Sequence, residues 1–179
     1  MKYQVKRADE LTENEIKTII NLWEVSEWAS MEPGYFRSFF KDSEFHFLID
    51  SEEEILALIR LNFDFILEIF DKKYHFAEAV GLVSAQKKKG YGKELIKYII
   101  ENITERNLES IGFCLSELRP FYDKCDISIL HHKAKSIKEK SGSKWIPSDD
   151  DDILIFNLSD EKKELLNQLS SENNAYLIQ

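Results

Sequence analysis

Residues 77–92 read AEAVGLVSAQKKKGYG, and this stretch decides the fold of the chain. The apolar run from Tyr74 to Ala85 predicts a strand at the centre of a sheet. The loop from Gln86 to Gly92 follows directly and holds three lysines and two glycines. Glycines let backbone N–H groups turn tightly toward a ligand, and a helix that follows presents its positive end there. The order of strand, glycine loop and helix is therefore typical of a cradle for a pyrophosphate.

The residues after the glycines and the position of the loop in the chain exclude two common nucleotide-binding loops. A Walker-type loop ends in Gly-Lys-Ser/Thr, whereas Gly92-Lys93-Glu94 lacks the hydroxyl that would hold magnesium. A Rossmann fingerprint lies after the first strand of a βαβ unit, but this loop stands in the middle of the chain, after a predicted hairpin. On the loop alone, a glycine turn with solvated lysines stays the alternative to a phosphate cradle.

Two periodicities around the loop predict a mixed α/β chain in one domain, residues 1–179. Helical spacing is found at residues 12–27, 31–40, 93–106 and 160–169. Strand-like runs are found at residues 3–6, 45–49, 55–63, 110–116 and 153–158. Thr12 and Glu15 form a predicted capping box for the first helix. Residues 65–70 are expected to form an irregular connection, 128–144 a mixed basic stretch, and the tail after residue 169 to be frayed.

The composition indicates a soluble domain with a real core, because 43% of the residues are apolar and 32% are charged. The net charge of −9 argues against nucleic acid or an anionic membrane as a partner. The N-terminus lacks an apolar leader, and no run reaches the roughly 18 apolar residues of a membrane span. Cys114, Cys125 and the pair His131-His132 lack metal-ligand spacing. We therefore expect reduced thiols, no metal and a cytoplasmic location.

The loop and its surroundings resemble the GNAT superfamily of acyl-CoA-dependent N-acyltransferases, whose pyrophosphate loop reads Arg/Gln-x-x-Gly-x-Gly/Ala. The order of elements also matches: strand, two helices, hairpin, long strand, loop and helix, strand, then a short helix bearing a tyrosine. The resemblance implies the α/β GNAT fold, with a central mixed and mostly antiparallel sheet flanked by helices. It implies acetyl-CoA as cosubstrate and these cofactor-binding residues in the loop: Lys87, Lys88, Lys89, Gly90, Tyr91 and Gly92.

A narrower resemblance is to the aminoglycoside 2′-N-acetyltransferases. Glu78 stands nine residues before Lys87, as that family's glutamate stands before its loop arginine. Residues 116–122, SELRPFY, look like its Ser…Arg-x-x-Tyr segment, and residues 146–152 resemble its Pro-Asp-Asp-Asp run before the final strand. The chain departs from that family after Tyr122, where CDI at 125–127 replaces Gly-Trp, and at a C-terminus that lacks tryptophan.

The resemblance implies three catalytic roles. Tyr122 is expected to protonate the departing CoA thiolate, with simple packing on the core as the alternative. Glu78 is expected to accept the proton of the acceptor amine, directly or through water, with a structural carboxylate as the alternative. Backbone N–H groups of the strand at Val80 and Leu82 would polarise the thioester carbonyl.

Four consecutive aspartates precede the strand at 153–158, and like charges at this density repel one another. A polycationic ligand would relieve the repulsion, whereas a solvated loop would tolerate it, so both interpretations stay open. Read with the resemblance, the residues expected to bind the acceptor are Glu78, Asp149, Asp150, Asp151 and Asp152.

These observations predict an acetyl-CoA-dependent N-acetyltransferase that acts on a primary amine of a small cationic substrate, aminoglycosides included. The alternatives are a non-catalytic acyl-CoA-binding regulatory protein and an N-acetyltransferase of peptides or proteins. The acceptor, the position acetylated and the oligomeric state stay open, with a homodimer as one alternative.

Overall fold

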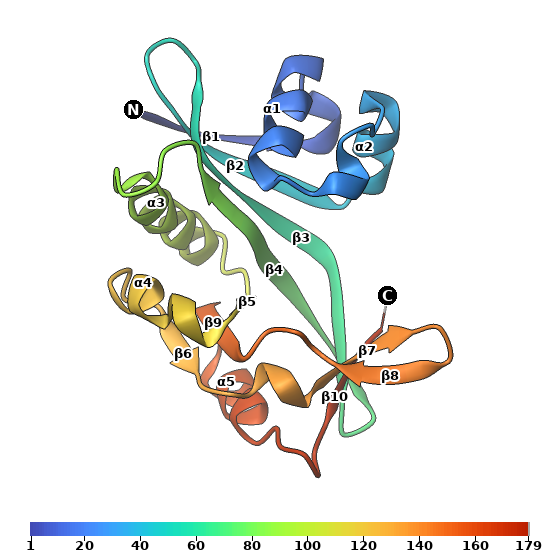
Figure 1. Cartoon of the computed structure of the whole chain (residues 1–179). Coiled ribbons are helices and arrows are strands. Elements are labelled where there is room, and N and C mark those ends of the chain that lie inside the picture. The colour runs from blue at the N-terminus through green and yellow to red at the C-terminus, as the bar shows by residue number, and fades with distance from the viewer. Residues whose placement is uncertain (179) are drawn as a thin grey trace. The chain divides into compact units, whose positions relative to one another are not determined.

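The computed structural model describes residues 1–178 (Figure 1). The strands are β1 (Lys2–Arg7), β2 (Ser43–Ile49), β3 (Ile55–Ile69), β4 (Lys72–Ser84), β5 (Ser110–Cys114), β6 (Ser128–Leu130), β7 (Ile137–Ser141), β8 (Lys144–Pro147), β9 (Asp152–Asn157) and β10 (Ala175–Leu177). The α-helices are α1 (Glu13–Trp23), α2 (Pro33–Phe39), α3 (Tyr91–Glu105), α4 (Arg119–Asp123) and α5 (Asp160–Asn167).

The chain divides into two compact units. The first unit holds Met1–Asn62 and Val80–Ile99, and the second holds Phe63–Ala79 and the chain from Ile100 onward. The elements β3, β4 and α3 contribute residues to both units.

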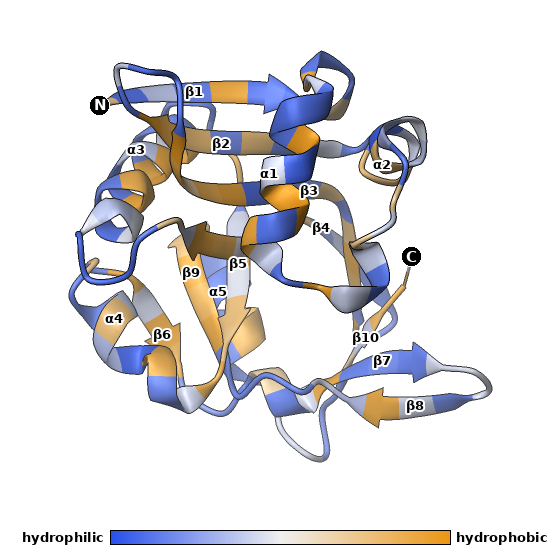
Figure 2. Ribbon diagram, turned by 45° about the horizontal axis from the view of Figure 1, so that its top comes forward, coloured by the Kyte–Doolittle hydropathy of each residue, from blue (hydrophilic) through white to orange (hydrophobic). Residues whose placement is uncertain are grey.

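In the first unit, β2 pairs antiparallel with β1 on one side and with residues 55–62 of β3 on the other. The predicted capping box begins α1: the Glu15 N–H donates to Thr12 Oγ1 (3.2 Å), and the Thr12 N–H donates to Glu15 Oε2 (2.8 Å). The helix ends earlier than predicted, at Trp23, because Glu24 adopts a left-handed conformation with φ of +54°. Figure 2 shows α1 banded by hydrophobic and hydrophilic residues, as an amphipathic helix requires.

The core of the first unit is a cluster of buried aliphatic and aromatic side chains. Ile16 and Ile19 of α1 are fully buried, as their helical spacing predicts. They belong to a cluster with Phe36 of α2, Phe45 of β2 and other apolar residues of the same unit. Burying such side chains removes apolar surface from water and is the main force that attaches both helices to the strands.

In the second unit, β5 lies parallel to residues 77–79 of β4 and antiparallel to β9, which also pairs with β6. A further set joins β10 antiparallel to β3, parallel to β7, and β7 antiparallel to β8. The residues of β9 are hydrophobic over most of its length (Figure 2), and five of them are buried. Antiparallel pairs outnumber parallel ones, so the predicted mixed, mostly antiparallel sheet is confirmed.

Two local predictions are wrong. The stretch 65–70 is not a connection, because β3 continues to Ile69 with Phe65, Leu67 and Ile69 all buried in alternation. The tail is not frayed, because β10 pairs between β3 and β7, and the N–H of Ile178 donates to the carbonyl of Ile66 (3.0 Å). Residues 153–158 are therefore not the last strand of the chain.

Among residues 1–178, no helix combines the length and the hydropathy that a membrane span requires.

Candidate active site

The glycine loop leads from β4 into α3 and is exposed from Gln86 to Gly90. Gly90 has φ of +82°, a conformation that favours glycine, and its carbonyl accepts the Glu94 N–H (3.0 Å) at the start of α3. The first N–H groups of an α-helix have no partner within it, so this end of α3 is positive. Lys87, Lys88 and Lys89 add cationic side chains to the same exposed loop. These residues fit the diphosphate of a CoA molecule.

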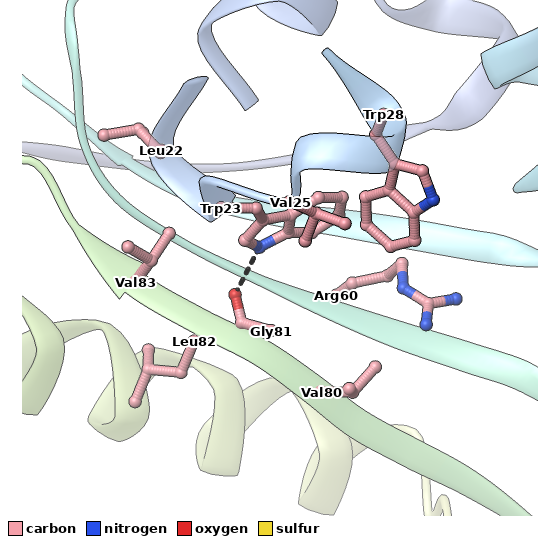
Figure 3. Close-up of a pocket in the computed structure, with 9 residues that line it drawn as sticks. All are labelled: Leu22, Trp23, Val25, Trp28, Arg60, Val80, Gly81, Leu82 and Val83. Atoms are coloured by element: carbon pink, nitrogen blue, oxygen red, sulfur yellow. Dashed lines mark hydrogen bonds between the residues drawn. The ribbon is translucent and has the colours of Figure 1, made fainter. Parts of the chain in front are cut away.

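Further back along β4, a pocket of about 340 Å³ opens in the first unit. We call it the tryptophan pocket; its lining residues, drawn in Figure 3, are Leu22, Trp23, Val25, Trp28, Arg60, Val80, Gly81, Leu82 and Val83. It therefore includes both strand residues, Val80 and Leu82, whose backbone N–H groups the family resemblance implies as partners of the thioester carbonyl.

Trp23 is attached to β4 by its side chain. Its Nε1–H donates to the carbonyl of Gly81 (2.7 Å), the bond dashed in Figure 3. Gly81 has φ of +70°, and a Cβ placed there would lie 2.8 Å from Trp23 Nε1. Sequence reasoning missed Trp23, although a lone glycine inside an apolar strand signals a bulge or a close approach.

In the second unit, Glu78 and Asp150 line one pocket of about 120 Å³. A third carboxylate, Glu139 of β7, lines it too, and we call this the acidic pocket. Its remaining walls are Phe65, Phe113, Ile137, Ser148 and Leu177. Burial raises the pKa of Asp150, and the nearby Glu139 raises it further. Glu139 stands in an alternating Lys-Glu-Lys stretch that gave no sequence signal of a site.

The other three aspartates of the run have separate surroundings. Asp149 is exposed to solvent. Asp151 accepts the backbone N–H of Ser116 (2.8 Å) and lies 3.5 Å from Lys135 Nζ. The structure thus brings only Asp150 of the four together with Glu78.

Asp152 has a carboxylate that is fully occupied within the protein. Its side chain is 0% exposed, and it accepts two bonds from Arg119, from Nε (2.5 Å) and Nη2 (2.7 Å). The backbone N–H of His132 donates a third bond (2.7 Å). Burial alone would raise the pKa of Asp152, but the Arg119 guanidinium and the His132 N–H hold it below its ordinary value. Asp152 therefore has a structural role in this part of the second unit, and the acceptor site proposed below does not include it.

Tyr122 lies in the short helix α4 and is only 8% exposed. Its backbone carbonyl accepts the N–H groups of Cys125 (3.0 Å) and Ile127 (3.1 Å), which fixes the end of α4. Burial raises the pKa of Tyr122 well above its usual value, so the hydroxyl keeps its proton at every physiological pH. Burial also raises the pKa of the Cys114 thiol to about 11, which makes it a poor nucleophile at neutral pH.

The family is decided by a match of residues 9–126 to the Acetyltransferase (GNAT) family. The chain belongs to this family. It is therefore an N-acetyltransferase of the GNAT fold, a class that uses acyl-CoA and an acceptor substrate. The match does not select the aminoglycoside branch.

Solved structures share the fold of this GNAT enzyme at low sequence identity. An N-acetyltransferase from Staphylococcus aureus has a TM-score of 0.55 and 17% identity, with 86% of this chain and 96% of that chain covered. A chimera of the Vibrio cholerae spermidine N-acetyltransferase and hSSAT has a TM-score of 0.53 and 14% identity, with 84% and 92% covered. A conserved Enterococcus faecalis protein of unknown function, a probable N-acyltransferase, has a TM-score of 0.52 and 13% identity, but the match covers 72% of this chain and only 32% of that longer one. A search of curated proteins finds no match.

Proposed function

We propose that this GNAT enzyme transfers the acetyl group of acetyl-CoA to a primary amine of a small cationic molecule. The observation that carries the proposal is the acidic pocket, because Glu78, Glu139 and Asp150 line one cavity of the second unit. Carboxylates held close together repel one another, and an ammonium group among them would relieve that repulsion. The pocket's apolar walls would strengthen the attraction by excluding water.

The cofactor is proposed to bind through its diphosphate at the loop from Lys87 to Gly92. The positive φ of Gly90, the exposed lysines and the start of α3 support this assignment. Basic residues at the cofactor loop and acidic residues at the acceptor pocket match the opposite charges of CoA and an ammonium substrate.

In the proposed reaction, the amine nitrogen bonds to the thioester carbonyl carbon and the carbon–sulfur bond breaks. Glu78 receives the proton that the ammonium must lose before its nitrogen can attack. Tyr122 gives its proton to the departing thiolate, and the second proton that the nitrogen loses on becoming an amide restores the hydroxyl. The backbone N–H groups of Val80 and Leu82 would stabilise the negative charge that develops on the carbonyl oxygen.

Aminoglycosides remain a finer proposal within this class, supported by the sequence resemblance around Glu78 and Tyr122. The acidic pocket, of about 120 Å³, has room for one aminoalkyl arm of such a molecule and not for its several rings.

The test is thiol release from acetyl-CoA with a panel of amines that includes spermidine, kanamycin-type aminoglycosides with and without a 2′-amino group, and a peptide with a free N-terminus. We expect turnover with small cationic amines, and a loss of at least tenfold in kcat/KM for Glu139→Gln. Asp149→Asn is the matched control, because it removes one exposed carboxylate of the same run. Turnover restricted to the peptide, or an undiminished rate for Glu139→Gln, would refute the proposal.

A further inference from the structure

The indole of Trp23 joins the end of α1 to one backbone carbonyl of β4, within the first unit. Its Nε1–H donates to the Gly81 oxygen at 2.7 Å (Figure 3). Gly81 has φ of +70°, and a Cβ at this position would lie only 2.8 Å from Trp23 Nε1. A residue with a side chain would push the indole away, so the tryptophan and the glycine form one matched contact.

The carbonyl that Trp23 holds belongs to the peptide group between Gly81 and Leu82. A trans peptide group is planar, and its carbonyl and its N–H are directed to opposite sides. While the Gly81 oxygen is bonded to Trp23, the Leu82 N–H is therefore directed away from the indole. Glycine allows wide rotation of the peptide group that follows it, so this plane needs an anchor outside the strand.

The same bond also changes the strength of the Leu82 N–H as a donor. Hydrogen bonds in a chain polarise one another, and a carbonyl that accepts a bond shifts positive charge onto the N–H of its own peptide group. Trp23 thus acts on both the direction and the strength of one backbone donor.

The Trp23 ring is itself fixed by other aromatic rings of the first unit. The distances between ring centroids are 5.6 Å to Trp28, 6.5 Å to Phe36, 5.8 Å to Phe40 and 6.1 Å to Phe45. Phe36 and Phe45 are fully buried. An anchor that is already in place costs no reorganisation during a reaction, which is the condition under which a donor stabilises developing charge best.

We infer that Trp23 is a positioning residue for acetyl transfer: through the Gly81 carbonyl it orients and strengthens the Leu82 N–H for the thioester oxygen. This inference rests on the proposed function, which assigns the N–H groups of Val80 and Leu82 to that oxygen. In this role Trp23 acts through the strand and touches neither acetyl-CoA nor the acceptor. Its effect is therefore expected in kcat, because the charge on the oxygen develops only during transfer.

Two substitutions of Trp23 separate the hydrogen bond from the packing of the ring. Trp23→Phe keeps an aromatic ring but has no N–H, whereas Trp23→His places Nε2 the same number of bonds from Cβ as the indole Nε1. Loss of an oxyanion donor costs about 10²–10³ in kcat, so loss of its anchor in Trp23→Phe should cost less, about tenfold, with KM for acetyl-CoA nearly unchanged. Trp23→His, neutral at pH 8, should retain most of the parent kcat. Packing alone predicts the reverse order, because phenylalanine buries more apolar surface than histidine.

The matched control is Phe36→Leu, measured like the others with acetyl-CoA and spermidine. It removes a ring that packs on Trp23 but leaves the Nε1–H in place. We expect it to lower the thermal unfolding temperature at least as much as Trp23→Phe and to leave kcat unchanged.

Infrared spectroscopy of bound acetyl-CoA gives a readout that needs no acceptor. A hydrogen bond to the thioester oxygen lowers the stretching frequency of the carbonyl, which ¹³C labelling identifies. We expect a lower frequency than in solution for the parent and for Trp23→His, and a return toward the solution value in Trp23→Phe. Slow hydrogen exchange of the Trp23 indole, measured by NMR, should accompany the bond in the parent.

The outcomes separate the positioning role from the proposed function. Equal kcat in the parent and Trp23→Phe, or an equal loss in Trp23→Phe and Phe36→Leu, would overturn the role of Trp23 and leave amine acetylation standing. An unshifted carbonyl band or a fast-exchanging indole in the parent would overturn it too, even where Trp23→Phe fails to fold. If no amine is acetylated, the proposed function fails, and a carbonyl shift that is lost in Trp23→Phe and kept in Trp23→His would still support the role of Trp23.

Discussion

The hydroxyl of Tyr122 belongs to a side chain that is 8% exposed, and burial raises its pKa. We predict that Tyr122→Phe lowers kcat by about tenfold or more, because the thiolate then leaves without a positioned proton donor. Affinity for acetyl-CoA should change little, since the hydroxyl acts on charge that develops only during transfer. Single-turnover thiol release and calorimetry measure the two quantities.

Tyr74→Phe in β4 is the control for the Tyr122 experiment. Tyr74 is a partly buried tyrosine that packs against the core of the second unit, so the substitution makes the same chemical change. It should leave kcat unaltered. An unchanged single-turnover rate in Tyr122→Phe would remove the general-acid role.

Asp152 gives a second prediction, for stability. Its pKa is lowered in the folded state, so the ionised carboxylate stabilises the fold fully above the unfolded-state pKa of about 3.9. This stabilisation is lost as pH falls through the folded-state pKa. We expect Asp152→Asn to lower the free energy of unfolding at pH 7 by about 3 kcal/mol, the lower end for a broken buried pair because Arg119 keeps some contact with water. Urea unfolding at pH 7 and at pH 3 measures both effects.

The variant should also be less sensitive to acid than the parent between pH 4 and pH 3. The exposed Asp149→Asn should show neither effect, since its carboxylate has few contacts to lose. If the parent and Asp152→Asn had the same slope of unfolding free energy against pH, the ion pair of Asp152 with Arg119 would not be the source of the acid sensitivity.

Single residues differ in how far the sequence reveals their role. Glu78 and Asp150 were predicted because each breaks a local pattern: a carboxylate in an apolar strand and a run of aspartates. Trp23, Arg60 and Glu139 were not predicted. Each looks ordinary in its own segment, and its significance comes from partners far along the chain, such as Gly81 for Trp23.

At the scale of elements, local periodicity found α1, α2, α3 and α5, but pairing decided strands that it missed, among them the end of β3 and β10. The turn after β3 uses Phe70 and Asp71, both at positive φ, where hairpin turns usually have Asn-Gly. Without that signal, the end of β3 looked like a connection. The strand β10 has three residues, and its partner residue Leu67 lies more than a hundred positions earlier. No window along the sequence contains that contact.

The loop between β4 and α3 gives a third prediction. Gly90→Val should abolish CoA binding measured by calorimetry, because a β-branched residue is strained at φ of +82° and shifts the backbone N–H groups of the cradle. The fold should persist, since a Cβ at Gly90 would meet no atom within 4 Å.

Gly142→Val is the matched control for the loop. Gly142 lies in the turn between β7 and β8 at φ of +60°, and a Cβ there would also meet no atom within 4 Å. The strain is therefore similar, but the site is in a turn of the second unit with no assigned ligand. CoA affinity that survives in Gly90→Val, or is lost equally in Gly142→Val, would contradict the cradle.

At the scale of the whole molecule, the net charge of −9 acts on every approaching amine, wherever the amine finally binds. A cationic acceptor would be attracted from all sides, and salt would weaken this attraction because the Debye length falls from about 30 Å at 0.01 M to about 8 Å at 0.15 M. A drop in affinity with salt therefore shows attraction, but it does not identify a pocket.

Two single-charge variants make the distinction, and they give the last prediction. Asp149→Asn and Asp150→Asn each change the net charge from −9 to −8, so they alter the field of the whole molecule equally. Only Asp150 lines the acidic pocket. We expect the apparent affinity for a cationic amine to fall with salt in the parent and in Asp149→Asn alike. In Asp150→Asn it should be weaker at every salt concentration, with a shallower slope. Identical slopes in the two variants would mean that net charge alone attracts the amine, and the acidic pocket would lose its place as the acceptor site.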